Sequence, residues 1–220
     1  MTATLEEQLD RAEGDRAVAP DPEVKVTRRR IDNLLIALGI ASTAVLLIAG
    51  FLLNWGSNFA EDYVSDELSA QNISFPDEES LVGQGREDLV KYAGVQVTTG
   101  EHAEAYASFI AGHVAGIADG QTYADLGGPE RSANAAVTEA IDSGAPADEV
   151  AALEADAAAV TAQRDSVYKG EMLRGALLNT YAWSTIGRIA GIAAVVAFGA
   201  AIVTLLLVVA GGLHIRRVHV

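Results

Sequence analysis

Two long, uncharged apolar runs constrain the fold of this chain more than any other feature of its sequence. Residues 34–53 form the first run, of 20 residues, and residues 189–213 form the second, of 25. A helix rises about 1.5 Å per residue, so each run is long enough to cross a hydrocarbon core of about 30 Å. The runs therefore predict an all-α membrane protein with two transmembrane helices, at residues 34–54 and 186–213.

Neither a buried core helix nor a cleavable signal peptide accounts as well for the apolar runs. A soluble protein of 220 residues has too little chain to bury two such helices on every side while exposing 15 basic and 30 acidic side chains. A cleavable signal peptide has an apolar segment of only about 7–15 residues, followed by a cleavage site between small residues. The first run is longer and lacks a clear site of that kind, so we interpret it as a retained anchor.

Basic residues near the runs predict how the chain is oriented. They are absent from residues 55–67 and lie beyond the runs, where Lys25, Arg28, Arg29 and Arg30 precede the first run and Arg216 and Arg217 follow the second. Because basic flanks stay on the cytoplasmic side, both termini are expected in the cytoplasm and the chain in the plasma membrane. The tail at residues 1–33 has few large apolar side chains and is predicted to be disordered, and residues 214–220 form a second, short cytoplasmic tail.

The segment between the runs, residues 55–185, carries the excess negative charge. It holds 22 acidic and six basic side chains, which leaves a net charge of −16. This segment is predicted to be an acidic extracytoplasmic domain, and nucleic acid is excluded as its partner because like charges repel. The chain has no cysteine, so disulfides and thiolate metal sites are excluded as well.

Helical periodicity predicts that this outer domain is mainly helical. Apolar side chains recur every three or four residues in 101–118, and Gly120 is suited to end that helix. Pro129 is expected at the first position of a second helix, which Gly144 ends. A third helix begins near Pro146, meets no further proline and is predicted to continue into the second transmembrane helix.

Three shorter segments complete the predicted architecture. The first transmembrane helix is expected to continue outward to about residue 70, because residues 72–76 break its helical pattern. The glycines Gly120, Gly127 and Gly128 are expected in a turn between helices. Residues 71–100 fit neither a helix nor a strand and remain unassigned.

No pattern in the sequence predicts a catalytic, cofactor-binding or metal site. The chain lacks a G-x-S-x-G nucleophile elbow, a phosphate loop with G-K-[ST] and an H-E-x-x-H zinc helix. The many carboxylate pairs of the outer domain are interpreted as solvated surface. His102 and His113 lie about 16 Å apart along one predicted helix, too far to share a metal ion. We interpret them as structural, with a metal-binding or proton-linked role as the alternative.

Small residues on the predicted transmembrane helices mark candidate interaction faces. Gly187 and Gly191 form one small-xxx-small pair, and Gly39 and Thr43 form another. Such pairs let two helix backbones approach closely. They fit equally well a pairing of the two helices with each other and a contact with another membrane protein or a second copy of the chain.

Four short motifs give the chain a family resemblance. They are L-x-x-x-N-I (Leu68, Asn72, Ile73), A-Y-A-x-x-I-x-x-H (Ala105, Tyr106, Ala107, Ile110, His113), G-x-T-Y-A-D-L (Gly120, Thr122, Tyr123, Ala124, Asp125, Leu126) and L-R-x-x-L (Leu173, Arg174, Leu177). With these motifs, residues 30–213 resemble a group of uncharacterised actinobacterial two-span membrane proteins, often labelled aromatic ring-opening dioxygenases. The resemblance implies an envelope protein in the plasma membrane of a Gram-positive-type lineage. Three of the motif side chains, His113, Tyr123 and Asp125, form a candidate cluster in the outer domain if the fold brings them together.

The dioxygenase label does not agree with the residues present. Non-haem iron chemistry needs two histidines and a carboxylate around one ion, whereas His102 and His113 are separated by almost three helical turns. We therefore expect no enzymatic activity, no metal and no cofactor. The leading hypothesis is a non-enzymatic accessory or scaffold protein that associates through its spans and outer helices with a larger membrane assembly. The alternative is an extracytoplasmic ligand or cation sensor that signals to the cytoplasmic tail.

Overall fold

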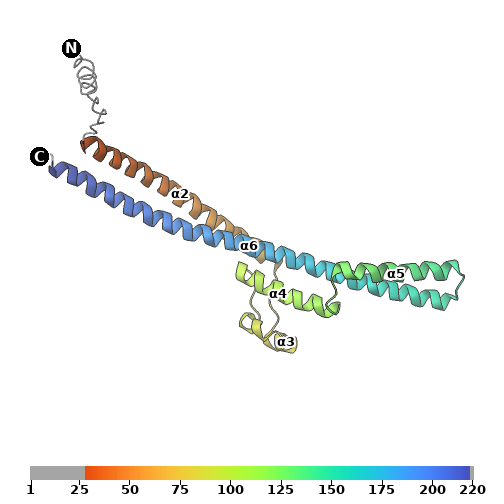
Figure 1. The fold of residues 1–220 in the computed structure, drawn as a ribbon. Coiled ribbons are helices and arrows are strands. Elements are labelled where there is room, and N and C mark those ends of the chain that lie inside the picture. The colour runs from red at the N-terminus through yellow and green to blue at the C-terminus, as the bar shows by residue number, and fades with distance from the viewer. Residues whose placement is uncertain (1–27, 219–220) are drawn as a thin grey trace, which may run out of the picture. The chain divides into compact units, whose positions relative to one another are not determined.

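The computed structural model describes residues 28–218, which fold almost entirely into helices (Figure 1). In chain order the elements are α2 (Arg28–Gln71), α3 (Glu78–Gly83), the 3₁₀ helix η1 (Glu87–Tyr92), α4 (Gly100–Ile117), α5 (Tyr123–Asp142) and α6 (Ala147–Val218). Residues 28–218 contain no strand, and their one β-bridge is an isolated antiparallel pair between Ser74 and Gln96. The predicted all-α class is confirmed.

Two helices, α2 and α6, are long and apolar enough to cross a membrane. Only 11% of the apolar stretch of α2 and 17% of that of α6 is buried within the chain, so neither is the buried core helix of a soluble protein. Their exposed leucine, isoleucine and valine side chains need an apolar environment outside the chain. The chain divides into two compact units, the terminal unit (Met1–Val45 with Ala201–Val220) and the central unit (Leu46–Ala200), which are described separately below.

The outer limits of α2 and α6 differ from the predicted tails. Helix α2 begins at Arg28, so residues 28–33 are helical where disorder was predicted, and α6 continues through residues 214–218 to Val218. Arginine is a good helix former, and adding a residue to an existing apolar helix needs no new nucleus, so both helices extend past their apolar runs. The predictions for residues 1–27 and 219–220 lie outside the described residues.

The predicted inner limits of the long helices are confirmed. Helix α2 continues past its apolar run to Gln71, and α6 is one uninterrupted helix from Ala147 into the second run. Gly120 and Gly144 follow the ends of α4 and α5 with φ angles of 78° and 70°, a region that favours glycine.

Helix α5 begins earlier than predicted, at Tyr123 instead of Pro129. Thr122 and Asp125 form a capping box, in which the Asp125 carboxylate accepts a 2.9 Å hydrogen bond from the Thr122 amide and the Thr122 hydroxyl accepts one of 3.3 Å from the Asp125 amide. Two otherwise unpaired amides are satisfied, which fixes the start of the helix. The two glycines before Pro129 therefore lie inside α5 and not in a turn, and Pro129 costs it a single backbone hydrogen bond.

The main core of the central unit forms around the segment that the sequence left unassigned. This segment folds into α3 and η1, joined to the rest by short connections and by the bridge at Ser74. Its apolar side chains pack against α2, α4 and α6, and the buried members of the core are Val64, Leu68, Phe75, Leu81, Leu89, Tyr92, Val97, Ala103, Ala107 and Leu177.

A second, smaller core joins α4, α5 and the first half of α6. Val114, Ala118, Leu126 and Val167 form its buried cluster. Gly170 of α6 belongs to the same contact, because a Cβ atom there would lie 2.2 Å from Cγ2 of Val114. The packing places α5 alongside the first part of α6 within the central unit (Figure 1). The glycine therefore strengthens the helix contact instead of interrupting α6.

Candidate functional site

Both glycines of the predicted pair on α6 face α2 within the central unit. A Cβ atom at Gly187 would lie 2.9 Å from the Cβ of Ala60, and one at Gly191 would lie 2.8 Å from the Oγ of Ser57. Real Cβ atoms do not approach each other as closely as at Gly187, whereas the Ser57 hydroxyl that faces Gly191 can rotate away, so Gly187 is the position at which the crossing needs glycine. Of the two possibilities that the sequence left open, these glycines serve the pairing of the chain's own helices.

The predicted pair on α2 has the same role in the terminal unit. A Cβ atom at Gly39 would lie 2.4 Å from Cγ2 of Val208 on α6. Thr43 is buried, and its hydroxyl donates a 2.8 Å hydrogen bond to the Gly39 carbonyl. Neither residue is therefore presented as a free surface to a partner.

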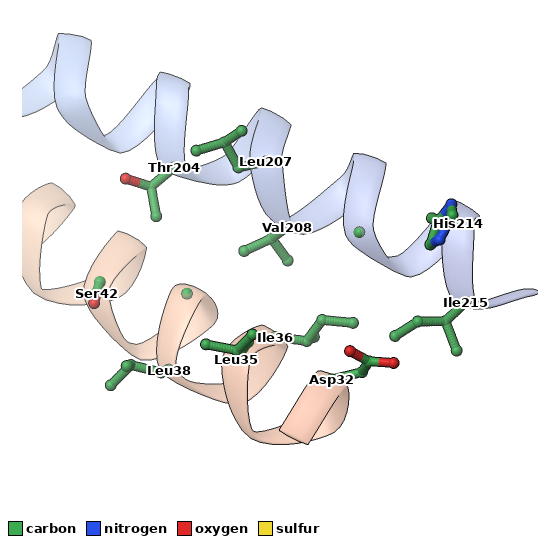
Figure 2. A pocket seen from close by; sticks show the side chains of 12 residues that line it. Asp32, Leu35, Ile36, Leu38, Ser42, Thr204, Leu207, Val208, His214 and Ile215 are labelled. Atoms are coloured by element: carbon green, nitrogen blue, oxygen red, sulfur yellow. The ribbon is translucent and has the colours of Figure 1, made fainter. Parts of the chain in front are cut away.

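The terminal unit holds an apolar groove of about 470 Å³ between α2 and α6 (Figure 2). Half of its lining residues are leucine, isoleucine or valine, including Ile36 and Val208, and Asp32, His214 and Ile215 lie towards one end. Among the described residues no ion pair joins Asp32 to His214. The groove is suited to an acyl chain or an apolar side chain, and it holds no combination of groups that suggests catalysis.

A larger cavity, of about 680 Å³, lies in the central unit where α2 and α6 meet the start of α4. We call it the three-helix crevice. Its charged lining residues are Glu61 and Asp62 of α2 and Arg188 of α6. Five residues with hydroxyl side chains line it as well, Ser57, Ser65, Thr98, Thr99 and Ser184. Ile192 and Val195 form an apolar end, so the crevice combines both charges, hydroxyl groups and an apolar surface.

The charges of the three-helix crevice are not paired with each other. Within residues 28–218, no side-chain hydrogen bond or ion pair engages Glu61, Asp62 or Arg188. The start of α4 is held against α6 at this point, since a Cβ atom at Gly100 would lie 2.2 Å from that of Ser184. Both signs of charge therefore line one cavity, and all three side chains are exposed to solvent in the chain alone.

The predicted cluster of His113, Tyr123 and Asp125 does not form a common site. His113 is exposed on α4 and lines a separate hollow of about 430 Å³. Tyr123 lies at the start of α5, where its ring stacks under the Arg164 guanidinium at 4.0 Å. Asp125 caps the same helix, and its hydrogen bonds from the Thr122 amide and hydroxyl lower the pKa of its carboxyl group. Tyr123 and Asp125 therefore have structural roles in the start of α5.

His102 also has a structural role, because it contacts the segment that precedes α4. Its Nδ1 atom accepts a 3.4 Å hydrogen bond from the Thr98 amide, and its ring packs edge-on against Tyr92 with centroids 5.5 Å apart. The Tyr92 hydroxyl donates a 2.5 Å hydrogen bond to Glu101, which lowers the pKa of that carboxyl group, and nearby Lys91 adds to the effect. Among residues 28–218, no group of three histidine, aspartate or glutamate side chains is arranged to hold a metal ion.

Sequence reasoning did not predict that these charges line one crevice. Glu61 was interpreted as solvated surface and Arg188 as a side chain that reaches toward the lipid headgroups, and both side chains are exposed in the chain alone. A signal was present, because Ser57, Glu61 and Ser65 recur every four residues and so share one face of α2. That this face meets Arg188 could not be read from the sequence, because the two helices are far apart along the chain.

Comparisons of the chain with protein-family models, with curated proteins and with solved structures find no match.

The close approach at Gly191 leads to a direct test of the helix pairing. A Cβ atom at this position would lie 3.6 Å from the Cβ of Ser57, within the range of about 3.5–4.5 Å found in disulfides. The double variant Ser57→Cys with Gly191→Cys is expected to form an intramolecular disulfide on mild oxidation, seen as a faster band on a non-reducing gel. The chain has no other cysteine, so the product is unambiguous.

The matched control moves one cysteine to the opposite face of α6. Ile189 is exposed, so Ser57→Cys with Ile189→Cys is expected to remain reduced within a single chain. Equal crosslinking in both variants, or none in the first, would contradict the helix pairing.

Proposed function

We propose that the chain is a two-span plasma-membrane protein that acts as a non-enzymatic scaffold for a larger membrane assembly. Both termini lie in the cytoplasm, and the acidic helical domain between the spans lies outside. Helix α6 carries this proposal, because one uninterrupted helix contains both an apolar run and the outer rod on which α5 packs. At about 1.5 Å per residue, residues 147–185 extend roughly 58 Å. A rod of this kind holds a docking surface at a set distance from the bilayer.

Exposed apolar side chains outside the two runs support a partner. Monomeric soluble surfaces rarely gather such groups, and they favour protein contact where they occur together. On α6 they are Tyr168, Met172, Leu173, Leu178 and Trp183, and on α2 they are Trp55, Phe59 and Tyr63. The close-packed glycines are used between α2 and α6, so the proposed contact is made by these larger side chains. The motif resemblance supports the same kind of protein, an actinobacterial two-span envelope protein.

The scaffold role is tested by isolating the chain from its own membranes. It is expected to remain in the membrane pellet after an alkaline wash, and to elute in native detergent as an assembly larger than its own 22.9 kDa. Met172→Gln is expected to weaken the assembly about tenfold, because exposed apolar anchors contribute about 1–2 kcal/mol each to a contact. Light scattering coupled to size-exclusion chromatography measures both results.

Lys169→Gln is the control, because it places the same residue type on the same helix at an exposed position without an ion pair among residues 28–218. It is expected to leave the assembly unchanged. A chain that elutes alone, under conditions in which other complexes of that membrane survive, would overturn the scaffold role.

The alternative function, a sensor that passes an external signal to the cytoplasmic tail, gains support from one observation. The three-helix crevice lies where the outer domain meets the helices that carry the apolar runs, so a ligand there would contact α2, α4 and α6 together. A ligand that changes the assembly state, and not merely the stability of the chain, would favour the sensor over the scaffold.

A further inference from the structure

We propose that the three-helix crevice binds the headgroup of a phospholipid with a primary ammonium group, of the phosphatidylethanolamine type. The inference rests on the membrane position proposed above but not on the scaffold role. Three properties of the crevice lead to it: its level along the helices, its mixed and unpaired charges, and its apolar end.

The level of the crevice corresponds to the headgroup region of a bilayer. Arg188 immediately precedes the uncharged run of α6, and Ile192 and Val195 lie within that run. On α2, the lining residues Ser57, Glu61 and Asp62 come shortly after the end of the apolar run. An arginine at this depth reaches toward phosphate groups with its stem along apolar surface.

The charges of the crevice match a ligand that carries both signs. Arg188 can donate two parallel hydrogen bonds to a phosphate, and Thr98 and Thr99 line the same crevice. The α4 helix begins at Gly100, so its positive end faces the same space and favours a negative group. Glu61 and Asp62 would accept hydrogen bonds from an ammonium group.

The same charges disfavour simpler ligands. A purely anionic lipid or free phosphate would be repelled by two carboxylates. Among the described residues no group of three histidine or carboxylate side chains is arranged to hold a metal cation. A quaternary ammonium headgroup, as in phosphatidylcholine, has no N–H group to donate to Glu61 or Asp62. A primary ammonium on a phosphodiester offers N–H donors to the carboxylates and phosphate oxygens to Arg188.

The apolar end of the crevice indicates a lipid over a soluble zwitterion. Ile192 and Val195 are 62% and 72% exposed in the chain alone, and they continue the crevice toward the apolar run. An acyl chain lying along them would bury this surface and gain about 25 cal/mol per Å² of apolar area. The cavity volume of about 680 Å³ lies within the usual range for ligand sites, roughly 300–1,000 Å³.

The test measures lipid selectivity on the full chain in mild detergent. The chain is mixed with equal amounts of phosphatidylethanolamine, phosphatidylcholine and phosphatidylglycerol that share the same acyl chains, and bound lipid is counted by native mass spectrometry. Phosphatidylethanolamine is expected to exceed each of the others about tenfold, because hydrogen bonds to charged groups contribute roughly 1.5–3 kcal/mol. Equal retention of the three lipids, or a preference for phosphatidylglycerol, would overturn the proposal.

Variants distinguish the two halves of the proposed headgroup contact. Arg188→Gln is expected to lower retention of phosphatidylethanolamine and phosphatidylglycerol alike, about tenfold. Glu61→Gln with Asp62→Asn is expected to abolish the preference for phosphatidylethanolamine and to raise retention of phosphatidylglycerol, because Arg188 then stands alone. Glu67→Gln lies on α2 outside the crevice lining and is expected to change neither. Unchanged lipid selectivity in the first two variants would show that the lipid does not bind in this crevice.

Two further results separate this inference from its alternatives. Displacement of the bound lipid by an equal concentration of soluble phosphoethanolamine would overturn the assignment to a lipid, because the apolar end would then contribute nothing. Loss of lipid selectivity in a chain that still elutes in its assembly would overturn the headgroup site alone and leave the scaffold role standing.

Discussion

Leu81→Ala is expected to lower the opening free energy of the main core by about 2–5 kcal/mol, the range measured for leucine truncation in tightly packed cores. Leu81 is fully buried in α3, and its side chain belongs to the core that joins α3 and η1 to the three longer helices. Truncation removes apolar contact and leaves a cavity that the surrounding helices cannot fill, since they are tied together elsewhere. The effect is expected around α3, η1 and α4 and not in the apolar runs.

Hydrogen exchange measured by mass spectrometry on the chain in nanodiscs reports this effect locally. Amides of residues 100–117 are expected to exchange about 30-fold to 5,000-fold faster in Leu81→Ala, because each 1.4 kcal/mol is about tenfold. Val82→Ala is the matched control. Val82 is the next residue in α3 and its side chain is 47% exposed, so the substitution is expected to change exchange rates only slightly. Similar acceleration in both variants would contradict the packing of Leu81 in this core.

Arg164→Met is expected to release α5 from α6, with a local loss of about 2 kcal/mol. The Arg164 guanidinium forms an ion pair with Glu130, donates a hydrogen bond of 3.3 Å to the Tyr123 carbonyl and covers the Tyr123 ring at 4.0 Å. The side chains of the ion pair are 24% and 19% exposed, so methionine leaves a carboxylate in a largely desolvated position without its partner. Solvent at these exposures makes the loss smaller than for a fully buried pair.

The measurement is again hydrogen exchange, now compared between two helices of the central unit. Amides of α5 are expected to exchange faster by about 30-fold, while those of the α4 segment beside the main core keep their rates. Arg131→Met is the control, because Arg131 is an exposed arginine of α5 without an ion pair among residues 28–218. Glu130→Gln added to Arg164→Met is expected to restore part of the loss, since it removes the unpaired charge. Equal exchange in the Arg164 and Arg131 variants would contradict the role of Arg164.

Local chemistry explains which helices could be predicted and which could not. The continuity of α6 follows from the absence of proline after Pro146, and the ends of α4 and α5 follow from Gly120 and Gly144, because each is a property of a few neighbouring residues. The start of α5 was predicted at Pro129 because proline is common at a first helical position. The capping box at Thr122 overrode that preference, since two satisfied amides fix a helix start more strongly than one proline.

The candidate site also depends on contacts between distant residues, which local chemistry does not predict. Small residues at Gly187 and Gly191 predicted a close helix approach, but not that α2 is the helix they meet. The predicted cluster at His113 failed because a shared motif does not place side chains in one cavity. Glu61 and Arg188 were each visible as charges, while their common cavity depends on how two distant segments cross.

The sequence by itself determined the helical class, the two apolar runs, the separation of acidic and basic residues, the limits of α4 and the inner ends of the two long helices. These properties depend on spacing along the chain and on the transfer of side chains between water and an apolar phase, which any short segment expresses alone. Only the tertiary structure decided that the glycines serve the chain's own helices, that α3 and η1 build the main core, and that opposite charges line one crevice. Such contacts join residues far apart in the chain, so they exist only once the helices have packed.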